Sequence, residues 1–134
     1  QIARAYAVIA NGGYLVTPHL SKLAKEKSSY KQPIKVDIEP IHLQVIKNGL
    51  SKAVQSGTGV SINYGSNNFP PIAGKTGTAE DVLGGPDHAW FVCFAPSENS
   101  ELLIVAFAEN TPGGGAYHAL PMAKKILEEW HKKK

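Results

Sequence analysis

Hydrophobic residues recur along the chain with two different spacings, one typical of helices and one typical of strands. Apolar residues at three- and four-residue steps predict a helix near the N-terminus that ends close to Ala10, before Asn11-Gly12-Gly13. The same spacing predicts a second helix that begins at Pro40 and is terminated by Gly57 and Gly59, and a third over residues 119–130. In the third helix we expect a buried stripe formed by Ala119, Ala123, Ile126, Leu127 and Trp130.

Five other segments have the composition or the alternation of strands. A short strand is expected over residues 14–16, with a partner in which Ile34, Val36 and Ile38 alternate with polar residues. Three further strands are expected over residues 72–79, 88–94 and 101–108. A connection as short as residues 96–100 permits only antiparallel pairing, because a parallel return needs a dozen or more residues. The predicted fold class is therefore α+β, with helices covering an antiparallel sheet in one domain.

Two polar segments are predicted to be loops, one over residues 25–32 and one over residues 61–71. The 134 residues are 43% hydrophobic, which is enough for a core. The net charge of +3 comes from scattered lysines and a lysine tail, and Arg4 is the single arginine, so nucleic-acid binding is disfavoured. The longest apolar stretches fall well short of the roughly 20 residues of a membrane-spanning helix. Because the chain opens in mid-pattern at Gln1, we expect it to be a piece of a longer protein.

The run from Ile72 to Ala79 combines groups that suit binding of a carboxylate beside a reacting carbonyl. Side chains alternate along a strand, so Thr76 and Thr78 should share one face and Lys75 should project from the other. Gly77 leaves the backbone bare for close approach of a ligand. The run therefore offers a cation, two hydroxyls and an unhindered backbone on one strand.

Lys-Thr-Gly is one of three signatures of the penicillin-recognising acyl-serine enzymes. The flanking segments carry the likeness further: residues 73–80, residues 88–96, a hydrophobic run closing on Glu109-Asn110, and the Gly113-Gly114-Gly115 turn. Together they resemble the C-terminal half of the transpeptidase domain of class B penicillin-binding proteins, most closely the penicillin-binding protein 2 type that serves cell elongation. The likeness spans nearly the whole chain. Cys93 departs from it, since the family often has glycine there, and we interpret it as a packing variant in an apolar strand.

This resemblance implies a partial penicillin-binding-protein/β-lactamase-like transpeptidase fold, with residues 1–134 as the C-terminal portion of the domain. It implies a serine-type peptidoglycan D,D-transpeptidase that cross-links stem peptides and is acylated by β-lactams. Lys75 would give a positive potential for the substrate carboxylate and help to tune the proton relay. The hydroxyls of Thr76 and Thr78 would bind that carboxylate beside Gly77, and the backbone N–H of Thr78 would be one of two oxyanion donors.

The same resemblance places the nucleophilic Ser-x-x-Lys and the Ser-x-Asn signature before Gln1, so the isolated chain should be inert. Its ligands would be the D-alanyl-D-alanine stem peptide and β-lactams, and its partners the upstream half of the domain and the cell-elongation machinery. The location implied is the periplasmic face of the bacterial cytoplasmic membrane, with an anchor outside this chain. Two alternatives remain: a β-lactam-sensing receptor domain and a non-catalytic module of the same fold. We expect no cofactor and no metal, because the five histidines are spread out and one cysteine adds no ligand pair.

Three letter patterns imitate other functional motifs. Ser28-Ser29-Tyr30-Lys31 matches Ser-x-x-Lys, but Lys31 has no apolar helix to lower its pKa for general-base work. Ser61-Ile62-Asn63 matches Ser-x-Asn but lies in a predicted loop only a dozen residues before the Lys-Thr-Gly strand. Gly74-Lys75-Thr76 ends like a P-loop, yet Phe69 stands where that pattern requires glycine. We interpret all three as accidental.

Some residues near the Lys-Thr-Gly strand have simpler structural explanations. His88 begins the next strand and is expected to be a structural hydrogen-bonding residue. Trp90 and Phe91 are adjacent, so they should face opposite sides of the sheet as core anchors. Glu80 and Asp81 could line the mouth of a cleft, but the default expectation is that they are solvated loop carboxylates.

Overall fold

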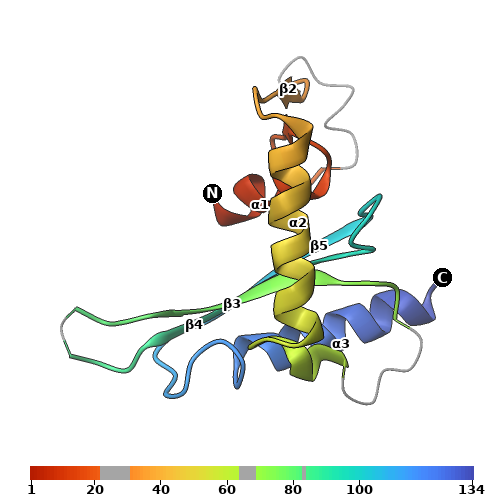
Figure 1. The fold of residues 1–134 in the computed structure, drawn as a ribbon. Coiled ribbons are helices and arrows are strands. Elements are labelled where there is room, and N and C mark those ends of the chain that lie inside the picture. The colour runs from red at the N-terminus through yellow and green to blue at the C-terminus, as the bar shows by residue number, and fades with distance from the viewer. Residues whose placement is uncertain (22–30, 64–68, 83) are drawn as a thin grey trace.

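The computed structural model describes residues 1–21, 31–63, 69–82 and 84–134 (Figure 1). The predicted loop over residues 25–32 and the Ser28 match fall almost wholly outside these residues. The elements in chain order are α1 (Ile2–Ala10), β1 (Tyr14–Leu15), β2 (Ile34–Lys35), α2 (Pro40–Gln55), the 3-10 helix η2 (Val60–Asn63), β3 (Ala73–Ala79), β4 (His88–Ala95), β5 (Leu102–Ala108) and α3 (Ala119–Lys132).

The central sheet has the order β3-β4-β5, and both of its pairings are antiparallel. Strand β3 pairs with β4 from Ala73 opposite Phe94 to Ala79 opposite His88. Strands β1 and β2 form a separate two-stranded antiparallel sheet. The predicted antiparallel α+β arrangement is therefore confirmed, and in the described part of the chain β3 and β5 are the edges of the main sheet.

Strand β4 is buried on both faces, which explains its nearly continuous hydrophobic sequence. Phe91 and Cys93 point into a core shared with α3 and η2, where they meet Leu120 and Leu127. Phe94 lies on the opposite face, in a smaller cluster with residues of α1 and with Ala73. Helices therefore cover the sheet from both sides, with α3 along one face and α1 against the other (Figure 1).

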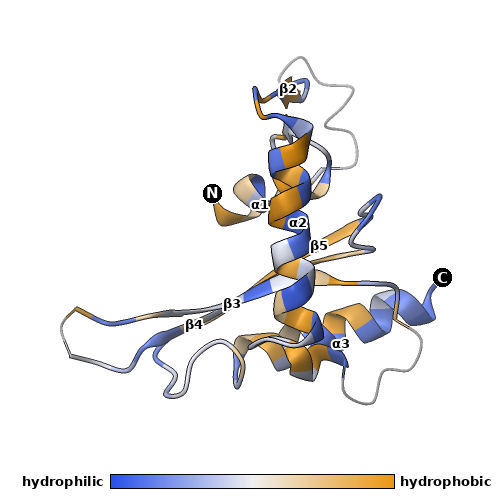
Figure 2. Cartoon of the chain, viewed as in Figure 1, coloured by the Kyte–Doolittle hydropathy of each residue, from blue (hydrophilic) through white to orange (hydrophobic). Residues whose placement is uncertain are grey.

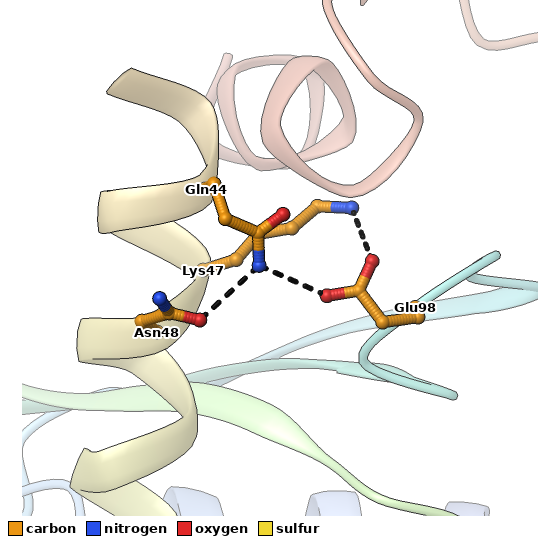
Figure 3. Close-up of polar contacts among 4 residues, drawn as sticks. All are labelled: Gln44, Lys47, Asn48 and Glu98. Carbon is orange, nitrogen blue, oxygen red and sulfur yellow. Dashed lines mark hydrogen bonds and ion pairs between the residues drawn. The ribbon is translucent and has the colours of Figure 1, made fainter. Parts of the chain in front are cut away.

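Helix α2 crosses the sheet and is held to the β4–β5 turn by polar contacts (Figures 1 and 3). The Lys47 side chain is almost buried, and its Nζ lies 3.4 Å from Oε2 of Glu98. Gln44 Nε2 donates to Glu98 Oε1 at 3.3 Å and to Asn48 Oδ1 at 3.1 Å. One carboxylate in the turn therefore receives hydrogen bonds from two side chains on successive positions of one helix face.

Several details of the sequence interpretation were wrong. The paired part of β2 ends at Lys35 rather than at Ile38, although the Val36 N–H still donates to the Gly13 carbonyl. The predicted loop over residues 61–71 begins in the 3-10 helix η2, which exists because the fully buried Ile62 anchors it in the core. Ile126 of α3 is 51% exposed, so it does not belong to the buried stripe predicted for this helix.

No helix within the described ranges has both the length and the apolar character needed to span a bilayer.

Candidate functional site

The Lys75-Thr76-Gly77-Thr78 run lies in the middle of the edge strand β3. Lys75 pairs with Val92 and Thr76 with Phe91, so neighbouring residues of the run belong to opposite faces of the sheet. Lys75 and Thr78 are exposed, whereas Thr76 and Gly77 are half-buried. The predicted separation of the lysine from the two threonines is confirmed by this register.

Lys75 has no carboxylate partner within the described part of the chain. Its Nζ donates one hydrogen bond, to the backbone carbonyl of Thr76 at 2.7 Å. An ammonium group has three donors. As far as the described residues go, the charge of Lys75 and two of its donors are available to a ligand at the strand edge.

Thr76 is contacted by a residue from outside the sheet. Its Oγ1 lies 2.6 Å from Oγ1 of Thr58, in the turn that follows helix α2. The turn is held by hydrogen bonds from Gly59 N–H to the Ala53 carbonyl and from Val60 N–H to the Gly57 carbonyl. The turn after α2 therefore places the Thr58 hydroxyl against the face of β3 that carries the threonines.

The glycine-rich turn before α3 packs directly on β3. A Cβ at Gly115 would meet the backbone oxygen of Trp90 and would lie 2.7 Å from the Gly77 oxygen and 2.9 Å from the Gly77 nitrogen. A Cβ at Gly114 would meet Oγ1 of Thr78. This close approach of two backbones requires glycine, and it places the turn beside the last two residues of the run.

A hollow of about 160 Å³ lies beside β3, on the face that carries Lys75. It is lined by Ile2 and Tyr6 of α1, by Lys75, Thr76 and Gly77, and by Trp90 and Val92 of β4. Trp90 is half-buried, and the centroids of its ring and of the Phe107 ring are 4.3 Å apart. Phe91 is a core anchor as predicted, but Trp90 is not, because it faces this hollow rather than the core.

Comparison with protein families matches residues 1–128 to the penicillin binding protein transpeptidase domain. The chain belongs to this family. Among curated relatives, the peptidoglycan D,D-transpeptidase MrdA of Haemophilus influenzae is 29% identical over 148 residues, which cover 96% of this chain and 23% of that protein. MrdA of Acinetobacter baumannii is 31% identical, with 97% of this chain and 22% of that protein covered. The chain thus spans about a fifth of the length of these relatives.

Solved structures of the family superpose well on this chain. Penicillin-binding protein 2 of Pseudomonas aeruginosa, in complex with WCK 5153, matches with a TM-score of 0.75 and 29% identity, covering 96% of this chain and 29% of that one. Penicillin-binding protein 2 of Helicobacter pylori, in its complex with MreC, also gives 0.75, with 26% identity and with 98% and 24% covered. The expected resemblance to penicillin-binding protein 2 and the transpeptidase fold are confirmed.

His88 and Asp81, which were also singled out from the sequence of this transpeptidase-family chain, have structural partners. His88 accepts a hydrogen bond at Nδ1 from the Asn110 backbone N–H, at 3.1 Å, which is the structural role predicted for it. Asp81 accepts from the Gly85 N–H at 3.0 Å in the β3–β4 hairpin, whereas Glu80 is exposed. Neither carboxylate lines the hollow beside Lys75.

The Ser-x-Asn match lies in η2, on the side of α2 that faces the core. Ile62 is fully buried, and Asn63 Nδ2 donates to the Val54 carbonyl at 2.6 Å, so the amide is used to terminate α2. Lys31 is exposed, and Ser28 lies outside the described residues. Within the described ranges, no group of three His, Cys, Asp or Glu side chains could hold a metal ion.

Sequence interpretation missed Thr58. Its hydroxyl reaches Thr76 across 18 positions of the chain, and no local pattern reports a contact of that kind. The one available signal was its place between Gly57 and Gly59, in the tight turn that follows a helix and precedes the Lys-Thr-Gly strand.

Proposed function

We propose that this chain is the C-terminal portion of a serine-type peptidoglycan D,D-transpeptidase. The observation that carries the proposal is the position of Lys75-Thr76-Gly77-Thr78 on the edge strand β3, with Lys75 and Thr78 exposed, in a chain of the transpeptidase family. The chain spans only about a fifth of its curated relatives. In this proposal a segment preceding Gln1 supplies the nucleophilic serine and its base, and completes the cleft against β3.

The proposed reaction is acyl transfer between two stem peptides. The upstream serine attacks the penultimate D-alanyl carbonyl, the terminal D-alanine leaves, and an amine of a second peptide then takes the acyl group and releases the serine. Because β3 is an edge strand, side chains from both of its faces can reach a ligand at its open edge, so Lys75 and the hydroxyls of Thr76 and Thr78 bind the terminal carboxylate there. The backbone N–H of Thr78 donates to the oxyanion in the tetrahedral intermediate. A β-lactam mimics this peptide but leaves a stable acyl-enzyme.

The proposed partners rest on a relative, and the proposed location rests on the proposed reaction. Penicillin-binding protein 2 of Helicobacter pylori has been solved in a complex with MreC. We therefore propose that this protein works with the cell-elongation machinery. Because peptidoglycan is assembled outside the cytoplasm, the proposed location is the outer face of the cytoplasmic membrane, with the anchor in a segment beyond this chain.

Labelling with a fluorescent penicillin tests the proposal. The complete protein should form a covalent adduct, the isolated chain should form none, and Lys75→Ala in the complete protein should slow adduct formation about a hundredfold by removing the cation at the carboxylate. Labelling of the isolated chain would assign the nucleophile to this chain. Unchanged labelling of the Lys75→Ala protein would remove the role given to that lysine.

Cross-linking of stem peptides separates the transpeptidase from the sensing receptor. A transpeptidase should join a donor stem peptide to an amine acceptor. A protein that is acylated by penicillin but joins no peptides would instead be a β-lactam sensor, and one that is not acylated would be a non-catalytic module.

A further inference from the structure

The hydroxyl pair Thr58–Thr76 joins the turn after α2 to the proposed carboxylate-binding strand. The two Oγ1 atoms are 2.6 Å apart, which is within the range of a short O–H···O hydrogen bond. Thr58 itself is exposed, so burial does not explain its position. The hydrogen bonds of Gly59 and Val60 fix the turn on the C-terminal side of Thr58, and that of Ser56 N–H to the Lys52 carbonyl fixes it on the N-terminal side.

We infer that Thr58 is a positioning residue that orients the Thr76 hydroxyl toward the carboxylate of the substrate. This inference rests on the proposed function. A hydroxyl has one hydrogen to donate and two lone pairs to accept with, whereas a carboxylate only accepts. When Thr76 binds the carboxylate it must therefore donate its hydrogen to it. The bond with Thr58 then runs in one direction only, from the Thr58 O–H to Oγ1 of Thr76.

This arrangement does two things for the bound state. It occupies a lone pair of Thr76 and so leaves the Thr76 hydrogen aimed away from Thr58, toward the strand edge. It also polarises the Thr76 hydroxyl, because a donor on one side of a hydroxyl strengthens the hydrogen bond that the hydroxyl donates on the other. Hydrogen bonds to an ionised carboxylate are stronger than those between neutral groups. The contribution of Thr58 should therefore affect mainly the reaction of ligands that carry a carboxylate.

Ligands with and without the carboxylate distinguish positioning from general disturbance of the site. The complete protein is reacted with benzylpenicillin and with its methyl ester, and the second-order acylation constant is measured for each. Thr58→Val keeps the shape of the side chain and removes the hydroxyl. We expect it to lower the constant for benzylpenicillin about tenfold, the worth of one hydrogen bond, and to leave that for the ester unchanged.

Four further variants complete the test: Thr58→Ser, Thr111→Val, Thr76→Val, and Thr76→Val combined with Thr58→Val. Thr58→Ser should restore the constant for benzylpenicillin. Thr111→Val, which removes a threonine hydroxyl that bonds the Ala108 carbonyl at the end of β5, should behave like the wild type. In a Thr76→Val background, Thr58→Val should have no further effect, because the hydroxyl through which it acts is gone.

Three results would overturn the inference: equal benzylpenicillin constants for Thr58→Val and the wild type, equal slowing of the acid and the ester, or additive effects of the Thr58 and Thr76 changes. A wild-type protein that benzylpenicillin does not acylate would overturn the proposed function itself. An acylated wild type with an unaffected Thr58→Val variant would overturn the positioning role alone.

Discussion

At Gly115 the absence of a side chain allows the turn before α3 to pack against the strand of the proposed site. A methyl group there would enter space held by the backbones of Trp90 and Gly77, one on each of two paired strands. The sequence indicates only that Gly113-Gly114-Gly115 forms a turn. Its contact with β3 is a consequence of tertiary packing, which the spacing of residues in the sequence does not contain.

We predict that Gly115→Ala lowers the free energy of unfolding by about 1–3 kcal/mol, the usual cost of overpacking. It should also slow acylation of the complete protein, because β3 must shift at Gly77. Gly49→Ala is the matched control: no atom outside helix α2 lies within 4 Å of a Cβ there, and alanine favours the helix. Chemical denaturation checks both, and a Gly115→Ala protein as stable as Gly49→Ala would contradict this packing.

Cys93 shows how burial changes the chemistry of one residue. Its thiol is fully buried in the core between the sheet and α3, and burial raises its pKa from 9.0 to about 12. The thiol therefore stays protonated in the folded protein. The sequence interpretation of a small packing residue is consistent with this position.

We predict that the folded protein does not react with a thiol reagent at neutral pH and reacts once unfolded.

The unfolded chain releases the Cys93 proton above pH 9, whereas the folded chain keeps it until about pH 12. Stability should therefore fall as pH rises through this window, by at most about 1.4 kcal/mol per pH unit from this group. Comparison with Cys93→Ala isolates the contribution, and identical pH dependence in both proteins would contradict it.

At the scale of elements, sequence periodicity predicts the long helices and strands well, but it predicts neither the short 3-10 helix nor the contacts between distant segments. The bounds of α2 and the antiparallel order of β3, β4 and β5 agree with the prediction because long apolar patterns and short connections leave few choices. The 3-10 helix η2 falls in a segment predicted to be a loop, because its single buried residue, Ile62, gives no periodic signal. The Lys47–Glu98 contact is also not predictable from local sequence patterns, because its two residues are 51 positions apart.

We predict an asymmetry between the two ends of this ion pair. Glu98→Ala leaves the Lys47 ammonium, whose side chain is 11% exposed, without a partner, and should lower the free energy of unfolding by about 1–3 kcal/mol. Lys47→Met removes the charge and keeps the apolar stem, so it should cost less. Glu129→Ala, which breaks an exposed pair with Lys132, is the control and should have little effect. A smaller loss of unfolding free energy for Glu98→Ala than for Lys47→Met would contradict the view that Glu98 compensates a buried Lys47 charge.

At the scale of the whole molecule, much apolar surface has no cover within the described residues. Apolar and polar residues alternate along α2 in Figure 2, and Ile41, Val45 and Ile46 are 65%, 61% and 42% exposed. Ile126 on α3 and Ile34 on β2 are exposed as well. Together with the two sheet edges, these surfaces have the character of interfaces rather than of a free domain surface.

We predict that the chain produced alone associates or binds a hydrophobic dye, and that the complete protein does so much less. Size-exclusion chromatography and dye fluorescence measure this directly. A monomeric isolated chain with no dye binding would show that these surfaces need no partner.

The central claim is that the exposed edge of β3 grips the carboxylate of the substrate. A crystal structure of the complete protein acylated by benzylpenicillin tests it most directly. The account predicts carboxylate oxygens within about 3 Å of the hydroxyl oxygens of Thr76 and Thr78, with Lys75 beside them. A penicillin carboxylate in solvent, or bound by residues outside Lys75-Thr76-Gly77-Thr78, would contradict it.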